Sequence, residues 1–318
     1  SLRSLIYVVI TACVLWLFMR QKIKHNVVVI SMFVLVLLDL VAVAKRYVNN
    51  DDFISSSQIE KPFEISRAQS DILTDKGHYR VMNFMVNPVN DGSTSFYHNS
   101  VGGYHAAKPR RYQELFDFQI AKNNIGVLHM LNTKYFIFPG ENNQEMVQLN
   151  DEANGNAWFV EDLKWVETAN EEIRALDSLD TKLTAVIDKK FEKVLKNRDY
   201  VIDSSASIEL VSYKANELEY KSNATQAQFV VLSEMYYKNG WNAYIDGVPV
   251  DHVRVNYVLR AMEVPKGEHT ILFKFEPEVI AQGSTISLIA YALFILIPLG
   301  WYVRERKKDE KGNTEEKI

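Results

Sequence analysis

The richest group of chemically capable side chains lies between residues 95 and 112, in the sequence SFYHNSVGGYHAAKPRRY. Glycine N–H groups can approach an anion closely, and Arg forms bidentate hydrogen bonds with phosphate or carboxylate. The helix expected from residue 108 would add the positive end of its dipole. We therefore predict an anion or ligand site built from the following residues: His98, Gly102, Gly103, Tyr104, His105, Lys108, Arg110, Arg111 and Tyr112.

The same segment has a second interpretation as an ordinary loop. In that alternative the tyrosines pack into the core, and the arginines pair with Glu114 and Asp117 on the helix that follows. The chain has no Gly-x-x-x-x-Gly-Lys-Ser/Thr sequence, so the segment is not a P-loop. The two interpretations remain open from the sequence.

Metal and hydrolytic chemistry find little support. His98 and His105 would share a face only on a continuous helix, and the glycine pair between them argues against one. Cys13 is the single cysteine and lies in an apolar run, so no cysteine metal cluster is possible. No Gly-x-Ser-x-Gly elbow and no paired-carboxylate motif is present. We predict no metal site, no cofactor and no self-contained hydrolase in this chain.

An aromatic group near residue 240 suggests a different ligand. Trp241 and Tyr244, with the Tyr236-Tyr237 pair, have flat rings of the kind on which sugars stack. Strand alternation offers core packing as the alternative, because Trp241 would share a face with Ile245 while Tyr244 points the other way. Trp241 and Tyr244 are therefore the sugar-stacking candidates.

Three apolar runs must hold these groups at a membrane. Residues 4–19, 27–44 and 286–303 are almost uncharged and approach the roughly 20 residues that a membrane helix needs. Asp39 lies within the second run, where an ionisable group is a functional candidate. Its alternative role is pairing with Lys45 or Arg46 at the interface.

Charge distribution predicts the orientation of these helices. Residues 47–285 have a net charge of −10. Because the whole chain has a net charge of −4, the remaining residues together have a net charge of +6. Because basic loops stay in the cytoplasm, we expect the link between the first two helices and the tail to be cytoplasmic, and the long segment to be outside. The negative outer segment disfavours binding to nucleic acid.

These patterns predict membrane helices combined with an α+β outer domain. We expect a helical hairpin at 1–46, a mixed α+β part at 47–204, a small antiparallel β-sandwich at 205–280, a membrane helix at 281–303 and a basic tail at 304–318. Strand-like alternation begins near residue 205, and Asp246-Gly247 predicts a two-residue hairpin turn. Asn170 is expected to cap a helix that runs to Leu176.

Several longer motifs resemble a known family. They are DLVAVAKRY at 39–47, SFYHNSVGGYHAAKPRRYQEL at 95–115, LNTKYFI at 131–137, GNAWFV at 155–160 and GWNAYIDGVPV at 240–250. Together they resemble the carboxy-terminal part of the YfhO-family bacterial membrane proteins, especially those of the Bacteroidota. The family looks like the GT-C glycosyltransferases, which transfer sugar from a polyprenyl-phosphate carrier on the outer face of the membrane.

The resemblance implies a function for a larger protein. We expect further protein upstream of Ser1, including the catalytic carboxylate in an early outer loop, so that this chain is a non-catalytic portion. It implies a bacterial inner-membrane location, a polyprenyl-phosphate sugar donor, an envelope glycan acceptor and contact with the lipid bilayer. A divalent metal in the larger enzyme stays open. The alternative is a membrane-anchored glycan-binding or assembly module without transferase activity.

Overall fold

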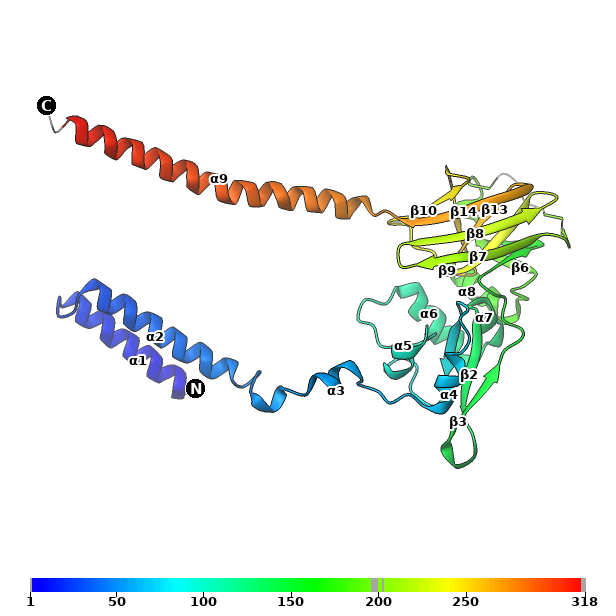
Figure 1. Cartoon of the computed structure of the whole chain (residues 1–318), viewed down its shortest axis with the longest axis horizontal. Helices are drawn as coiled ribbons and strands as arrows, with labels where there is room; N and C mark the ends of the chain where they lie inside the picture. The colour runs from blue at the N-terminus through cyan, green and yellow to red at the C-terminus, as the bar shows by residue number, and fades with distance from the viewer. Residues whose placement is uncertain (1, 196–199, 202, 316–318) are drawn as a thin grey trace. The chain divides into compact units, whose positions relative to one another are not determined.

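The computed structural model describes residues 2–195, 200, 201 and 203–315, and Figure 1 shows the course of the chain. Three of the described helices are long and apolar enough to cross a membrane: α1 (Leu2–Met19), α2 (His25–Ala44) and Glu278–Arg306 of α9 (Glu278–Glu315). They confirm the three predicted membrane helices. The last part of the predicted basic tail, residues 316–318, lies outside the described residues.

The chain divides into two compact units, Ser1–Glu64 and Ile65–Ile318. In the first unit α1 and α2 form a helical hairpin, and the guanidinium of Arg3 donates to the Asp39 carboxylate at 2.6 Å. The partner of Asp39 is thus on the other membrane helix. Because water is scarce within a bilayer, such an ion pair favours close association of the two helices. Two short helices follow α2 in this unit: η1 (Asn50–Asp52) and α3 (Ser56–Glu60).

The second unit begins with a small mixed layer. Strands β1 and β2 are parallel, and β3 pairs antiparallel with β2. The elements are α4 (Arg67–Ile72), β1 (Arg80–Asn83), α5 (Ser93–Tyr97), α6 (Arg110–Phe118), η2 (Ile120–Lys122), α7 (Ile125–Met130), β2 (Thr133–Pro139), η3 (Glu141–Asn143) and β3 (Glu145–Leu149). This layer confirms that a mixed α/β region precedes the sandwich.

Two further sheets form the sandwich. The five-stranded sheet is antiparallel and has the order β11 (Val248–Val250), β10 (Trp241–Ile245), β14 (Gly267–Phe275), β8 (Glu217–Ala224) and β7 (Ser207–Lys214). The six-stranded sheet has the order β4 (Ala157–Val160), β9 (Gln228–Met235), β13 (Leu259–Val264), β12 (Val253–Val255), β6 (Thr184–Asp188) and β5 (Asp162–Val166). Strand pairing therefore crosses the predicted division at residue 205, because β4, β5 and β6 all precede it.

The six-stranded sheet has a hydrophobic core on each of its faces. On β9, Val230 and Leu232 pack toward the five-stranded sheet, whereas Phe229 and Val231 pack into a larger core with residues of α6 and α7. This alternation follows from the two-residue period of a strand. Both faces of β9 are buried along residues 229–232, and this part of its sequence is a continuous apolar run.

Helix α8 (Ala169–Ala175), which is followed by η4 (Leu176–Ser178), begins two residues earlier than the sequence predicts. Its cap is Thr168, whose hydroxyl accepts a hydrogen bond from the N–H of Glu171 at 3.2 Å. The prediction that Asn170 caps this helix is wrong. Both residues are good caps, but only Thr168 has the extended backbone that a cap requires.

The turn between β10 and β11 has the predicted conformation. Asp246 and Gly247 have φ angles of 51° and 81°, as a type I′ turn requires. The Asp246 carboxylate also accepts hydrogen bonds from the N–H of Thr270 at 2.9 Å and from the imidazole of His269 at 2.6 Å. These bonds attach the hairpin tip to β14, the strand that leads into α9.

Candidate functional site

The backbone of the predicted anion loop is occupied by contacts within the protein. The N–H of Gly103 donates to the carbonyl of Pro88 at 2.6 Å, and that of Gly102 donates to the Ser100 hydroxyl at 3.1 Å. His98 is buried, and this burial lowers the pKa of its imidazole. The two glycine N–H groups expected to meet an anion are therefore already paired.

The cationic and aromatic side chains of the loop diverge. The Arg110 side chain is 91% exposed and pairs with Glu114 at 2.8 Å, while Arg111 turns inward to Glu172 at 3.0 Å. Tyr104 and His105 are exposed. The Nζ of Lys108 lies 6.0 Å from the centre of the Phe116 ring. The Tyr112 hydroxyl donates a hydrogen bond to the carbonyl of Val101. These are mainly the contacts of the loop alternative. The anion site stays a prediction, and Arg110 and Lys108, rather than Arg111, are the residues whose replacement tests it.

A buried ion cluster explains why Arg111 turns inward. The Glu172 side chain is fully buried and accepts hydrogen bonds from Arg111 at 3.0 Å, Arg254 at 3.2 Å and the N–H of Tyr257 at 3.1 Å. The Arg111 guanidinium also lies over the Tyr257 ring, 4.4 Å from its centre. The expected partner Asp117 is instead bonded to Gln113 at 2.7 Å. The cluster joins α6, α8 and the β12–β13 connection, so its role is to hold these elements together.

The second candidate group lies on a groove of about 510 Å³ beside the β10–β11 hairpin. Aromatic side chains of Tyr236, Trp241 and Tyr244 line it. Polar groups suited to hydrogen bonding line it as well, namely Lys238, Asn242, Asp251 and His252. Apolar rings combined with a few polar groups in a concave surface are typical of a small-ligand site.

Strand alternation places the two sugar-stacking candidates on different faces of β10. Trp241 packs against the sandwich core, and the Arg260 guanidinium covers its ring at 4.1 Å from the centre. The Tyr244 hydroxyl donates to Glu276 at 2.7 Å, as does the Asn242 amide at 3.0 Å. These bonds lower the pKa of Glu276. The groove is therefore bordered by a fixed indole and by a phenol held in place at its hydroxyl.

His252 adds a neutral polar group that the sequence pattern did not reveal. Burial, with a smaller contribution from the positive charge of Arg260, lowers the pKa of its imidazole to about 4. Its ring is edge-on to Phe273, and its Nε2 has no hydrogen-bond partner among the described residues. A neutral imidazole has one donor and one acceptor nitrogen, which is the pairing capacity of a sugar hydroxyl. The only sequence signal was a polar pair, Asp251-His252, between two short apolar strands.

The lowered pKa of His252 predicts a loss of stability in mild acid. Because the folded state favours the neutral imidazole, its contribution is complete above the unfolded pKa near 6.5 and is lost as the pH falls toward 4. The loss at pH 4 is at most roughly 3 kcal/mol. Urea unfolding at pH 7 and at pH 4 measures it.

The matched variant for this prediction is His252→Leu, which removes the titrating group but keeps an apolar side chain beside Phe273. The difference between variant and natural chain isolates the effect of His252 from that of other imidazoles, such as His98 and His129, whose pKa values are also lowered by burial or partial burial. An equal acid sensitivity in both chains would show that His252 does not titrate in this range.

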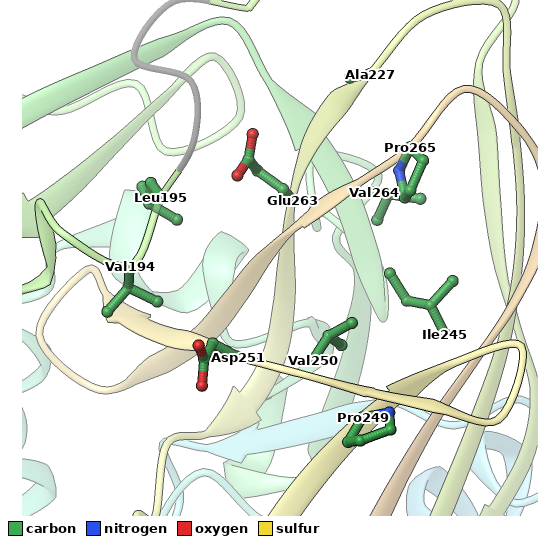
Figure 2. A pocket seen from close by; sticks show the side chains of 10 residues that line it. All are labelled: Val194, Leu195, Ala227, Ile245, Pro249, Val250, Asp251, Glu263, Val264 and Pro265. Carbon is green, nitrogen blue, oxygen red and sulfur yellow. The ribbon is translucent and has the colours of Figure 1, made fainter.

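A second cavity of about 430 Å³ lies against the same edge strand (Figure 2). Apolar side chains of Ile245, Val250 and Val264 line it, together with the carboxylates of Asp251 and Glu263. Pro249, Val250 and Asp251 line both this cavity and the aromatic groove. Strand β11 thus borders two cavities, of which the groove has the aromatic rings and the richer set of polar groups.

Comparison with known proteins gives one family. The family model described as bacterial membrane protein YfhO matches residues 178–287, which include β6, the strands of the five-stranded sheet and the beginning of α9. The groove residues all lie within this match. No curated protein and no solved structure matches the chain.

Proposed function

Because this chain belongs to the YfhO family of bacterial membrane proteins, we propose that it binds glycan as the carboxy-terminal, non-catalytic portion of a membrane glycosyltransferase. In this proposal the larger protein uses a polyprenyl-phosphate-linked sugar to glycosylate the cell envelope. Its catalytic carboxylate lies outside this chain. The part of the second unit that precedes α9 lies on the outer, periplasmic face of the inner membrane, which the segregation of charge along the sequence supports.

The aromatic groove is the observation that supports this proposal most directly. The Tyr244 ring offers a flat apolar face to the C–H groups of a pyranose, while Asn242 and Asp251 are suited to the hydroxyls at the ring edge. In the antiparallel pairing of β10 with β14, Trp241 lies opposite Phe275. Phe275 is the last residue of β14, and the membrane helix α9 begins at Glu278. A glycan in the groove would therefore be held close in sequence to a membrane-spanning segment.

The proposal predicts weaker glycan binding when a groove ring is removed. Replacing Tyr244 with Ala deletes one ring, whose stacking is worth about 0.5–1.5 kcal/mol, so the Kd should rise by roughly threefold to tenfold. Phe118→Ala is the matched control, because this ring is exposed on α6 and does not line the groove. Titration calorimetry of the full chain in nanodiscs with envelope polysaccharide fragments measures both. Equal Kd values for the Tyr244→Ala chain and the natural chain would contradict the proposal.

The same groove suits a glycan-binding or assembly module without transferase activity. The two functions differ in one measurable property of the larger protein. Membranes containing it should transfer sugar from a polyprenyl-phosphate donor to envelope glycan if it is a transferase. Glycan binding without any transfer would favour the module.

A further inference from the structure

The segment that follows α2 exposes an unusual number of large apolar side chains. Within the first unit, Tyr47, Val48, Phe53, Ile54 and Ile59 are each between 58% and 79% exposed. Side chains of this size are normally buried in a protein core or covered by a partner. Their exposure calls for an environment other than water.

The local backbone separates these side chains into groups. Asn49 caps helix η1 with two hydrogen bonds, each 2.8 Å long. Its side-chain oxygen accepts from the N–H of Asp51, and its own N–H donates to the carboxylate of Asp52. This closed polar turn stands between the pair Tyr47-Val48 and the pair Phe53-Ile54. The turn satisfies the N–H groups of Asn49 and Asp51 within itself, and it keeps the polar residues together between the two apolar pairs.

We propose that residues 47–59 lie in the interface of the bilayer, with their apolar side chains at the boundary between head groups and acyl chains. The segment continues directly from α2, a membrane helix with a mean hydropathy of 3.0, and belongs to the same compact unit. Lys45 and Arg46 stand between them, where long cationic side chains reach to head groups. Tyr and Phe are suited to this depth because an aromatic ring tolerates the mixed polarity of the interface.

This assignment differs from the domain boundary expected at residue 47. The segment belongs to the first unit with α1 and α2, and the second unit begins at Ile65. A protein partner covering the same side chains is the competing occupant. Site-directed spin labelling distinguishes lipid from a protein partner, because a nitroxide in lipid, in water or under protein differs in its accessibility to oxygen and to water-soluble reagents. Labelling at a chosen position is practicable because the chain has a single cysteine, Cys13.

The experiment uses the full chain with Cys13→Ser, reconstituted in vesicles of phosphatidylethanolamine and phosphatidylglycerol. A nitroxide is attached at Phe53→Cys or Ile59→Cys, and at Val248→Cys as the control, an equally exposed apolar position on β11. Collisions with oxygen, which concentrates in lipid, and with a water-soluble nickel chelate are then measured by electron paramagnetic resonance.

The expected result is an oxygen-to-nickel ratio several-fold higher at positions 53 and 59 than at position 248. Equal ratios at the three positions would place the segment in water and overturn the proposal. Low accessibility to both reagents at 53 and 59 would indicate that protein, in these vesicles another part or another copy of the chain, covers the segment, and it would overturn the proposal equally. Two labelled positions ensure that a local disturbance at one of them does not decide the outcome.

Discussion

Replacing Glu172 with Ala is expected to lower the free energy of unfolding of the second unit by about 3–5 kcal/mol. The reason is the asymmetry of a buried ion cluster. Glu172 is fully buried. Its removal takes the nearest carboxylate away from the guanidinium of Arg254, whose side chain is only 9% exposed. It also leaves the N–H of Tyr257 without the acceptor of its hydrogen bond. Urea unfolding of the full chain, followed by near-ultraviolet circular dichroism, measures the change.

Arg110→Ala is the control for this prediction. Arg110 precedes Arg111 in the chain and pairs with Glu114, but the Arg110 side chain is almost fully exposed to solvent. Its replacement should therefore lower the free energy of unfolding by less than about 1 kcal/mol. Arg111→Ala should fall between the two variants, because its side chain is 29% exposed and Glu172 keeps Arg254. A Glu172→Ala chain as stable as the Arg110→Ala chain would refute the cluster's structural role.

Replacing Gly102 with Ala should lower the free energy of unfolding by about 1–3 kcal/mol through overpacking. A Cβ at this position would lie 1.9 Å from the carbonyl oxygen of Pro88, which is backbone and cannot rotate away. The same oxygen accepts the hydrogen bond of the next residue, Gly103, so relieving the clash also breaks that bond. Thermal unfolding of the full chain measures this change.

The control is Gly283→Ala in α9, where an added Cβ would meet no heavy atom within 4 Å other than its chain neighbours and its own helix backbone, and where a helical backbone favours Ala. That chain should unfold at the same temperature or slightly higher. If Gly102→Ala left the unfolding temperature unchanged, the loop could rearrange freely, and its close contact with Pro88 would not be a fixed part of the fold.

The sequence predicted local elements better than their partners. Apolar runs of membrane length, the strand-like alternation after residue 205, as in β8, and the Asp246-Gly247 turn are local patterns, and all appear in the structure. The membership of β4, β5 and β6 in the larger sheet depends on pairing across long stretches of chain, such as Val255 with Ile187. Neither hydrophobic period nor turn chemistry encodes such a pairing.

The candidate site shows the same limit. Alternation predicted that Trp241 and Tyr244 face opposite ways, and their contacts with Arg260 and Glu276 agree. The partner of Arg111 was missed, because Glu172 lies 61 residues further along the chain. His252 was missed because its low pKa arises from burial beside Arg260, which only the packing of two sheets produces.

The central claim is that the groove beside β10 and β11 binds glycan, and the indole N–H of Trp241 reports on it directly. The full chain with its five labelled tryptophans would be titrated with envelope polysaccharide fragments and followed by nuclear magnetic resonance. We predict a saturable shift of the Trp241 signal, with no shift of Trp158, whose buried indole donates to the carbonyl of Thr181 at 2.9 Å. A Trp241 signal that does not move while glycan binds elsewhere, or binds nowhere, would contradict the account.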